Sequence, residues 1–115
     1  MTVIQTLGPK RRRTWFRYDG NVNGGTILAF RSGEISISPA LYKAVLQHFS
    51  GQTIRGGFSM TNPPLGGFGE WIERNSFKYG RSLTPRHGSF VAAILVHEGY
   101  IRSSLQGNAV ILHFP

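Results

Sequence analysis

The sequence has no cysteine, a single aspartate and only five carboxylate side chains in 115 residues. The absence of cysteine excludes a disulfide framework, a thiolate zinc site and a cysteine nucleophile, and it suits a reducing cytoplasm. No apolar run approaches the ~20 residues that a membrane-spanning helix needs, and no lysine-led signal segment is present. We therefore expect a cytoplasmic protein that does not insert into a membrane.

The four histidines lack the spacing of a metal site. No pair follows the His-x-x-x-His pattern of a helical metal site, and His97-Glu98 has no downstream histidine of the kind that a zinc protease needs. His48 and His113 lie beside apolar residues and are expected to be structural. No Walker or dinucleotide-binding glycine pattern is present either. The sequence therefore predicts no metal, no cofactor and no catalytic residue.

Positive charge is what the sequence has in excess. Thirteen Lys and Arg residues face five Asp and Glu residues, which gives a formal net charge of +8. Ten of the cations are arginines, whose planar guanidinium groups match phosphates and guanine edges and stack on bases. A surface of this charge attracts polyanions, chiefly nucleic acid.

Length and composition indicate one folded domain with a basic segment before it. A chain of 115 residues, 40% of them hydrophobic, can form one modest core. The first 13 residues end in Gly8-Pro9 and four adjacent cations, Lys10, Arg11, Arg12 and Arg13. Because Gly-Pro resists regular structure and like charges repel, we expect a flexible basic arm over 1–13 and a single α+β domain over 14–115. The arm would lie along phosphates or serve as a solvated tail.

Turn residues divide the domain into strands and helices. Runs rich in β-branched and aromatic residues predict strands at Thr14–Tyr18, Thr26–Arg31, Glu34–Ile37 and Thr53–Phe58. Helices are predicted from Pro39 to Gly51, over Phe68–Asn75 and from Pro85 to Gly99, with Ser38 and Thr84 as N-caps. Two further strands, Tyr100–Leu105 and Ala109–Phe114, flank a Gln106-Gly107-Asn108 turn.

From Ser38 to Phe114 this order of elements resembles that of a winged helix-turn-helix domain. The closest local similarity is Ile94-Leu95-Val96-His97-Glu98-Gly99-Tyr100-Ile101, followed by a hairpin. Such domains often end the third helix with an apolar-x-x-x-Gly run that leads into the wing. The resemblance implies an α+β fold in which N-terminal β-strands precede a winged-helix-like arrangement of three helices and a C-terminal β-hairpin.

The resemblance also implies which residues contact nucleic acid. In that family the third helix lies in the major groove, and the wing touches the backbone or the minor groove. This would bring Arg86, His87 and Ser89 to base edges. The alternative for Arg86 and His87 is an exposed first helical turn with no role in binding. Further contacts are expected from Lys78 and Arg81 on phosphates, from Arg102 in the wing, and from Arg17 together with the basic arm.

A second set of residues resembles the N-terminal half of a small-subunit ribosomal protein, the eighth in the usual numbering. The similar residues are Ile72-Glu73-Arg74-Asn75, then Pro85, then Ile94-Leu95 with Glu98-Gly99-Tyr100-Ile101. This resemblance likewise implies a nucleic-acid partner.

The sequence thus predicts a nucleic-acid-binding protein, in the first place a regulatory module for double-stranded DNA, with RNA as the alternative target. A homodimer would fit a regulator that recognises repeated half-sites. Two other functions stay open. A protein–protein adaptor or oligomeric module would meet an acidic partner through its basic face and its Pro-Gly loop. A metal-independent ribonuclease would use Glu70, Glu73, His87 and Arg86.

Overall fold

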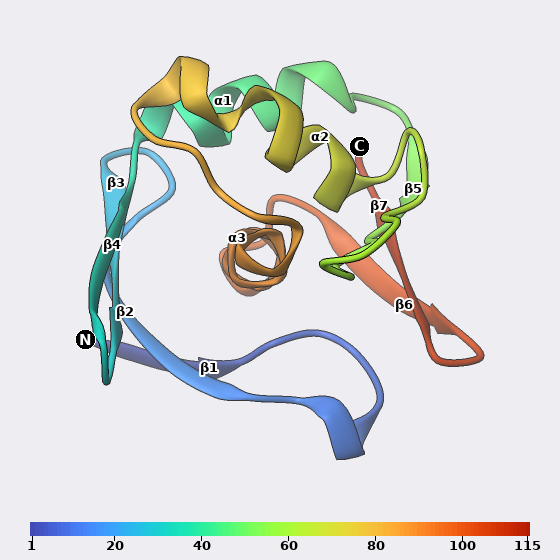
Figure 1. Cartoon of the computed structure of the whole chain (residues 1–115), viewed down its shortest axis with the longest axis horizontal. Helices are drawn as coiled ribbons and strands as arrows, with labels where there is room; N and C mark the ends of the chain where they lie inside the picture. Colours follow the sequence, from blue (N-terminus) through green and yellow to red (C-terminus); the bar gives the residue numbers. More distant parts are fainter.

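Two antiparallel sheets and two helices surround a third helix, which Figure 1 views along its axis at the centre of the molecule. The structure is a computed structural model that describes residues 1–115. Sheet A has the strand order β1-β2-β3-β4 and comprises β1 (Thr2–Gln5), β2 (Trp15–Asn21), β3 (Gly25–Phe30) and β4 (Gly33–Ile37). Sheet B has the order β5-β7-β6 and comprises β5 (Thr53–Arg55), β7 (Ala109–His113) and β6 (Arg102–Gln106).

Helices connect and cover these sheets. The α-helices are α1 (Pro39–His48), α2 (Phe68–Asn75) and α3 (Pro85–His97), and two short 3-10 helices are η1 (Lys10–Arg12) and η2 (Ser76–Tyr79). The predicted fold class is confirmed, since N-terminal antiparallel strands, three helices and a C-terminal β-hairpin follow one another in an α+β chain. None of the helices combines the length and the apolar character needed to cross a bilayer.

The segment predicted as a flexible arm over residues 1–13 is partly a strand. Thr2–Gln5 forms β1 and pairs antiparallel with the first half of β2. The β-branched residues at the start of the chain favour this extended pairing, and Ile4 is buried in the core. The basic turn that follows is held by Arg13, whose Nε donates a 2.8 Å hydrogen bond to the carbonyl of Gly8. The predicted domain boundary is therefore corrected, because sheet A begins at Thr2.

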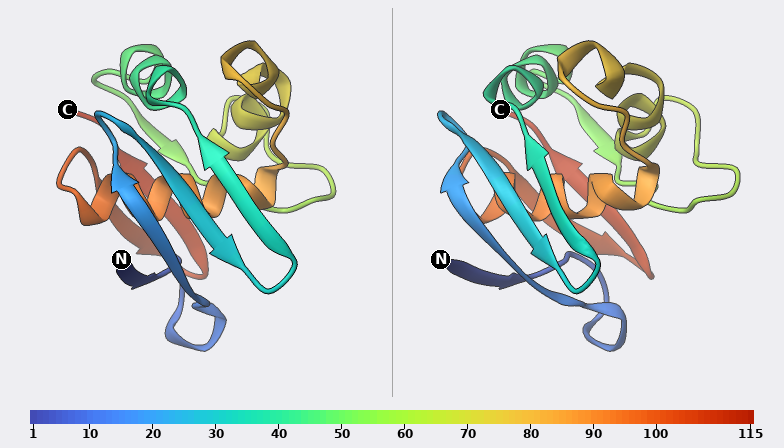
Figure 2. Two further views of the ribbon diagram at one scale, coloured as in Figure 1. Left: turned by 90° about the vertical axis from the view of Figure 1, so that its left-hand side faces the viewer. Right: turned by 60° about the vertical axis from the view of Figure 1, so that its left-hand side comes forward.

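Sheet A packs one face against the core and leaves its other face uncovered (Figure 2). Along β2 the side chains of Phe16 and Tyr18 are buried, whereas those of Trp15 and Arg17 are exposed, as the two-residue repeat of a strand requires. Leu28 on β3 belongs to the buried face. The outer face of the sheet therefore presents an aromatic and a cationic side chain to solvent.

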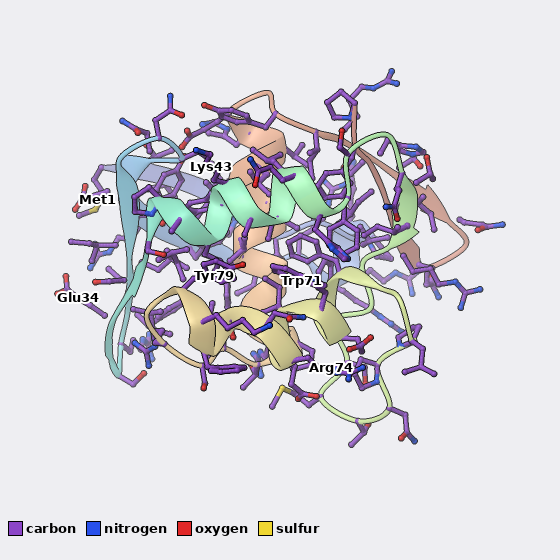
Figure 3. The ribbon with its side chains drawn as sticks, turned by 90° about the horizontal axis from the view of Figure 1, so that it is seen from above. Met1, Glu34, Lys43, Trp71, Arg74 and Tyr79 are labelled. Carbon is purple, nitrogen blue, oxygen red and sulfur yellow. The ribbon has the colours of Figure 1, made fainter.

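The helices α1 and α2 lie side by side over α3 (Figure 3). Trp71 of α2 stacks on His48 of α1, with 5.3 Å between the ring centroids, and on Tyr79 of η2, with 6.4 Å between them. Ser38 caps α1 by accepting from the N–H of Leu41, and its hydroxyl donates to the carbonyl of Tyr79. The predicted start of α1 is thus tied directly to the turn that precedes α3.

The helix α3 is the central element of the core. Nine of its residues are buried, namely Pro85, Gly88, Ser89, Phe90, Val91, Ala92, Ala93, Ile94 and Leu95. Its exposed side chains, Arg86 and His97, lie in its first and last turns. A helix that is apolar on nearly every side is buried rather than presented to a ligand. Only the first and last turns of α3 therefore present charged or ionisable side chains to solvent.

Candidate nucleic-acid interface

A cleft of about 550 Å³ opens beside the first turn of α3. Its walls come from the segment between Thr6 and Thr14, from the end of β5 with the loop after it, and from α3 and β7. Three arginines line the cleft, Arg12, Arg55 and Arg86, and no carboxylate lines it. We call this site the arginine cleft.

Arg12 is presented by the short helix η1, which closes on itself. The N–H of Arg12 donates a 2.8 Å hydrogen bond to the carbonyl of Pro9. At the base of this loop, the N–H of Thr6 donates to the carbonyl of Thr14 at 2.9 Å, and the N–H of Thr14 donates to Thr6 Oγ1 at 2.9 Å. The segment that carries Arg12 is thus a hydrogen-bonded turn attached to sheet A.

Arg55 is the last residue of β5, where it pairs with Ile111 of β7. Strand alternation leaves Arg55 exposed, while Ile54 before it packs against the core. The N–H of the next residue, Gly56, donates a 2.8 Å hydrogen bond to the carbonyl of Val110. The backbone that carries Arg55 is therefore fixed on sheet B.

Arg86 lies in the first turn of α3, after the N-cap Thr84. Its side chain is exposed, and its carbonyl accepts a 2.6 Å hydrogen bond from Ser89 Oγ. Ser89 also borders the cleft, but only 9% of it is exposed and its hydroxyl is engaged by the helix backbone. The hydroxyl hydrogen of Ser89 is thus used within the helix, and its contact with base edges stays a prediction.

His87 completes the cap of α3. The N–H of Thr84 donates to His87 Nδ1 at 3.1 Å, and the N–H of His87 donates to Thr84 Oγ1 at 3.2 Å. Partial burial, followed by the nearby charges of Arg81 and Arg86, lowers the pKa of His87. Only the neutral ring can accept at Nδ1, so the lowered pKa and the cap support each other. The Nδ1 atom of His87 is thus used within the protein, and a contact of its ring with bases stays a prediction.

The arginines of the cleft have no counter-ion within the protein. Neither of the two salt bridges in the structure includes them. In addition, Arg86 sits near the positive end of the α3 dipole, where a cation is unfavourable by a few tenths of a kcal/mol or about 1 kcal/mol at most. Like charges that line one cleft without partners repel one another, and an anion bound in the cleft would be attracted by them.

Apolar side chains form the rest of the walls, among them Phe58, Pro64 and Phe90. Phe90 packs against two rings of sheet A. Its ring centroid lies 4.9 Å from that of Phe16 and 5.0 Å from that of Phe30. Aromatic walls beside cations suit a ligand that carries both a flat ring and a phosphate.

The other predicted contact residues lie outside the arginine cleft, on several faces of the molecule. Lys10 and Arg11 are exposed on η1, Arg17 lies on the outer face of sheet A, and Arg102 is exposed on β6. Lys78 donates to Asn75 Oδ1 at 3.3 Å, and Arg81 borders a separate hollow beside Tyr79. The structure therefore unites only Arg12, Arg86 and Ser89 of the predicted set in one site.

Arg55 is the cleft residue that the sequence analysis missed. Its place at the end of a strand-like run was visible in the sequence, but its neighbours in space, Arg12 and Arg86, are far from it along the chain. The pairing of β5 with β7, which positions it, joins segments that no local pattern connects.

A larger hollow, of about 750 Å³, lies between α1 and the turn that joins β2 to β3. Its only cation is Lys43, and its other lining side chains, such as Gln47 and Ser50, are uncharged. Size alone does not identify a binding site, because specificity comes from convergent polar or charged groups. We therefore regard the arginine cleft as the candidate site.

Of the four residues of the ribonuclease hypothesis, only Arg86 lines the cleft. Glu70 accepts from the N–H of Gly66 and pairs with Arg74, His87 is engaged in the cap, and Glu73 does not line the cleft. No three His, Asp or Glu side chains lie together in a way that could hold a metal ion. No protein-family model, curated protein or solved structure matches this chain.

Proposed function

We propose that the protein binds nucleic acid and holds phosphate groups of the backbone in the arginine cleft. The observation that carries the proposal is the convergence of Arg12, Arg55 and Arg86 from three distant segments, with no carboxylate among them. Arginine is suited to this task, because its guanidinium group donates two parallel hydrogen bonds to phosphate oxygens. The net charge of +8 would draw a polyanion to the protein.

The proposal differs from a groove-reading regulator in the element that meets the ligand. The buried helix α3 contributes only its first turn to the cleft. Contacts made by arginines to phosphates carry little information about base sequence. We therefore expect binding that depends strongly on salt and weakly on sequence.

The test is binding of labelled oligonucleotides, measured by fluorescence anisotropy across a salt series. The variant R12A/R55A/R86A is compared with K43A/K78A/R102A, which removes the same number of exposed cations from other faces; Lys43, for example, projects from α1 (Figure 3). Three lost phosphate contacts should lower the slope of log affinity against log salt by about 2 on single strands. The control variant should keep most of the wild-type slope.

Two results would contradict the proposal. One is equal loss of affinity in the two triple variants, which would mean that charge matters but the cleft does not. The other is the absence of binding to any oligonucleotide at about 50 mM salt, where electrostatic binding is strong.

A second candidate function, docking of an acidic protein partner, is favoured by the loop between β5 and α2. This loop exposes Met60 and Leu65, the latter to 88%. In that case substitution of Leu65 by Ser would abolish capture of the partner, and oligonucleotides would bind only weakly.

A further inference from the structure

A second hollow, also of about 550 Å³, lies on the uncovered face of sheet A. Its outward side chains are those of Val3, Trp15, Arg17, Ala29 and Arg31. Trp15 is 65% exposed and Val3 is 59% exposed, although both are large apolar residues. We call this site the tryptophan hollow.

The strand register explains why the face is hollowed. Arg17 lies opposite Val3 on β1 and opposite Ala29 on β3, so these side chains form one row across the sheet. Ala29 is the smallest member of the row, and the larger Trp15 rises beside it in the next row of β2. The result is a shallow site with a small floor and an aromatic wall.

The charge around the hollow favours an anionic ligand on the side of Trp15. Arg17 and Arg31 line it, and no carboxylate does. The acidic residues of the same face lie farther from Trp15, with Glu34 opposite Ala29 on β4 and Asp19 opposite Ile27 on β3. The positively charged side of the hollow is thus the side near Trp15, which is also the side nearer to η1 in the chain.

The hollow and the arginine cleft border the same short segment of chain. Arg12 and Thr14 line the cleft, whereas Trp15 and Arg17 line the hollow. Trp15 lies on the outer face of sheet A, whereas Phe90 of the cleft packs against the inner face through Phe16. A ligand that occupies both sites therefore passes around the end of β2 beside η1. Phe90, a wall of the cleft, also packs beneath the hollow.

We infer that Trp15 provides a base-stacking subsite that continues the arginine cleft, so that the preferred ligand is a single strand of nucleic acid. The inference rests on the proposed function and adds the form of nucleic acid to it. A base stacks on an exposed aromatic ring only when its own face is free, which favours single strands over duplexes. A second copy of this chain is disfavoured as the occupant, because Arg17 and Arg31 would face like charges.

The test uses tryptophan fluorescence, because the chain has two tryptophans. In the variant W71F, Trp15 is the only fluorescent tryptophan, and it is titrated with a thymidine oligonucleotide of about 12 nucleotides, with the uridine equivalent, and with a DNA duplex of the same length. We expect saturable quenching by the single strands. In parallel anisotropy measurements, W15A should weaken single-strand affinity roughly ten-fold and W15F much less, whereas duplex affinity should stay unchanged.

The outcomes separate this inference from the function on which it rests. Binding of oligonucleotides with unchanged Trp15 fluorescence, or with equal affinity in W15A and wild type, would overturn the stacking subsite and leave nucleic-acid binding standing. Failure of every oligonucleotide to bind would overturn both. Thermal melting of W15A and W15F controls for folding, and an exposed side chain of this kind predicts little change.

Discussion

The two ends of α3 carry charges of opposite sign, and the protein compensates only one of them. At the C-terminal end, Glu98 accepts hydrogen bonds from Tyr18 Oη at 2.7 Å and from the N–H of Val22 at 2.9 Å. At the N-terminal end, Arg86 is exposed and makes no salt bridge. Each charge opposes the helix dipole at its own end.

The difference separates a structural charge from one that is free to bind a ligand. Tyr18 and Val22 are almost completely buried, so Glu98 joins the end of α3 to sheet A through two donors that belong to buried residues. Burial, followed by the hydrogen bond to Glu98, raises the pKa of Tyr18, which keeps the phenol a donor. The uncompensated charge of Arg86 lies at the arginine cleft, where we propose that a phosphate replaces the missing partner.

The largest effect is expected from the variant E98A at the compensated end. It leaves two buried donors unpaired, at about 1–3 kcal/mol for each such group, so we expect the free energy of unfolding to fall by about 2–3 kcal/mol. Chemical denaturation measures this change. The affinity for a single-stranded oligonucleotide, measured well below the melting temperature, should not change.

The matched variant for Glu98 is E98Q, which keeps an acceptor for Val22 and a polar partner for Tyr18. It should retain most of the stability that E98A loses. If E98A were as stable as the wild type, the view that these hydrogen bonds fasten α3 to sheet A would be wrong.

The variant R86Q, at the uncompensated end, should lower the affinity for nucleic acid and leave the stability nearly unchanged. Loss of one phosphate contact should weaken binding roughly five- to ten-fold and lower the single-strand salt slope by about 0.7. The free energy of unfolding should stay the same or rise by a few tenths of a kcal/mol, since a cation leaves the positive end of the dipole. Anisotropy measures the change in affinity, and denaturation measures the change in stability. If R86Q lost stability but kept its affinity, Arg86 would have a structural role and the proposed phosphate contact would be wrong.

The smallest effect concerns pH and the cap of α3. Because the pKa of His87 is lowered in the folded protein, the unfolded chain binds the proton more readily. The stabilisation by the cap is therefore complete above the unfolded value of about 6.5, and it is lost as pH falls through the lower folded value. The loss should be about 0.5–1 kcal/mol, the usual contribution of an N-cap hydrogen bond.

Denaturation between about pH 7.5 and 5 measures this dependence. The variant H87A should flatten the curve, whereas H97Q, which changes an exposed histidine at the other end of α3, should leave it as in the wild type. An identical pH dependence in H87A and wild type would show that the His87–Thr84 cap contributes nothing to stability.

Local chemistry in the sequence was enough to predict most of the fold. Ser38 and Thr84 are the N-caps of α1 and α3 in the structure, because a cap depends on a few neighbouring residues. The hairpin of β6 and β7 likewise follows from its Gly107 turn, with a φ of 62°. The strand β1 was not predicted, because Gly8-Pro9 and the four cations after it indicated a flexible arm over the whole segment.

The candidate site could be predicted only in part. The excess of arginine was visible, but which arginines converge depends on long-range pairing, such as that of β5 with β7. Arg86 is exposed in the first turn of α3, and Ser89 Oγ and His87 Nδ1 form hydrogen bonds within the protein. Periodicity predicted a helix there, but it did not show that sheet A and α2 cover nearly all of its sides.

The most direct test of the central claim is a titration of the isotope-labelled protein with a thymidine oligonucleotide of about 12 nucleotides, followed in the amide and side-chain nitrogen–proton spectra. We predict that shifts begin at Arg12, Arg55 and Arg86 and at the amides around them, and that the surroundings of Lys43 on α1 remain unchanged. Shifts centred on α1, or spread evenly over all exposed cations, would contradict the assignment of the arginine cleft as the nucleic-acid site.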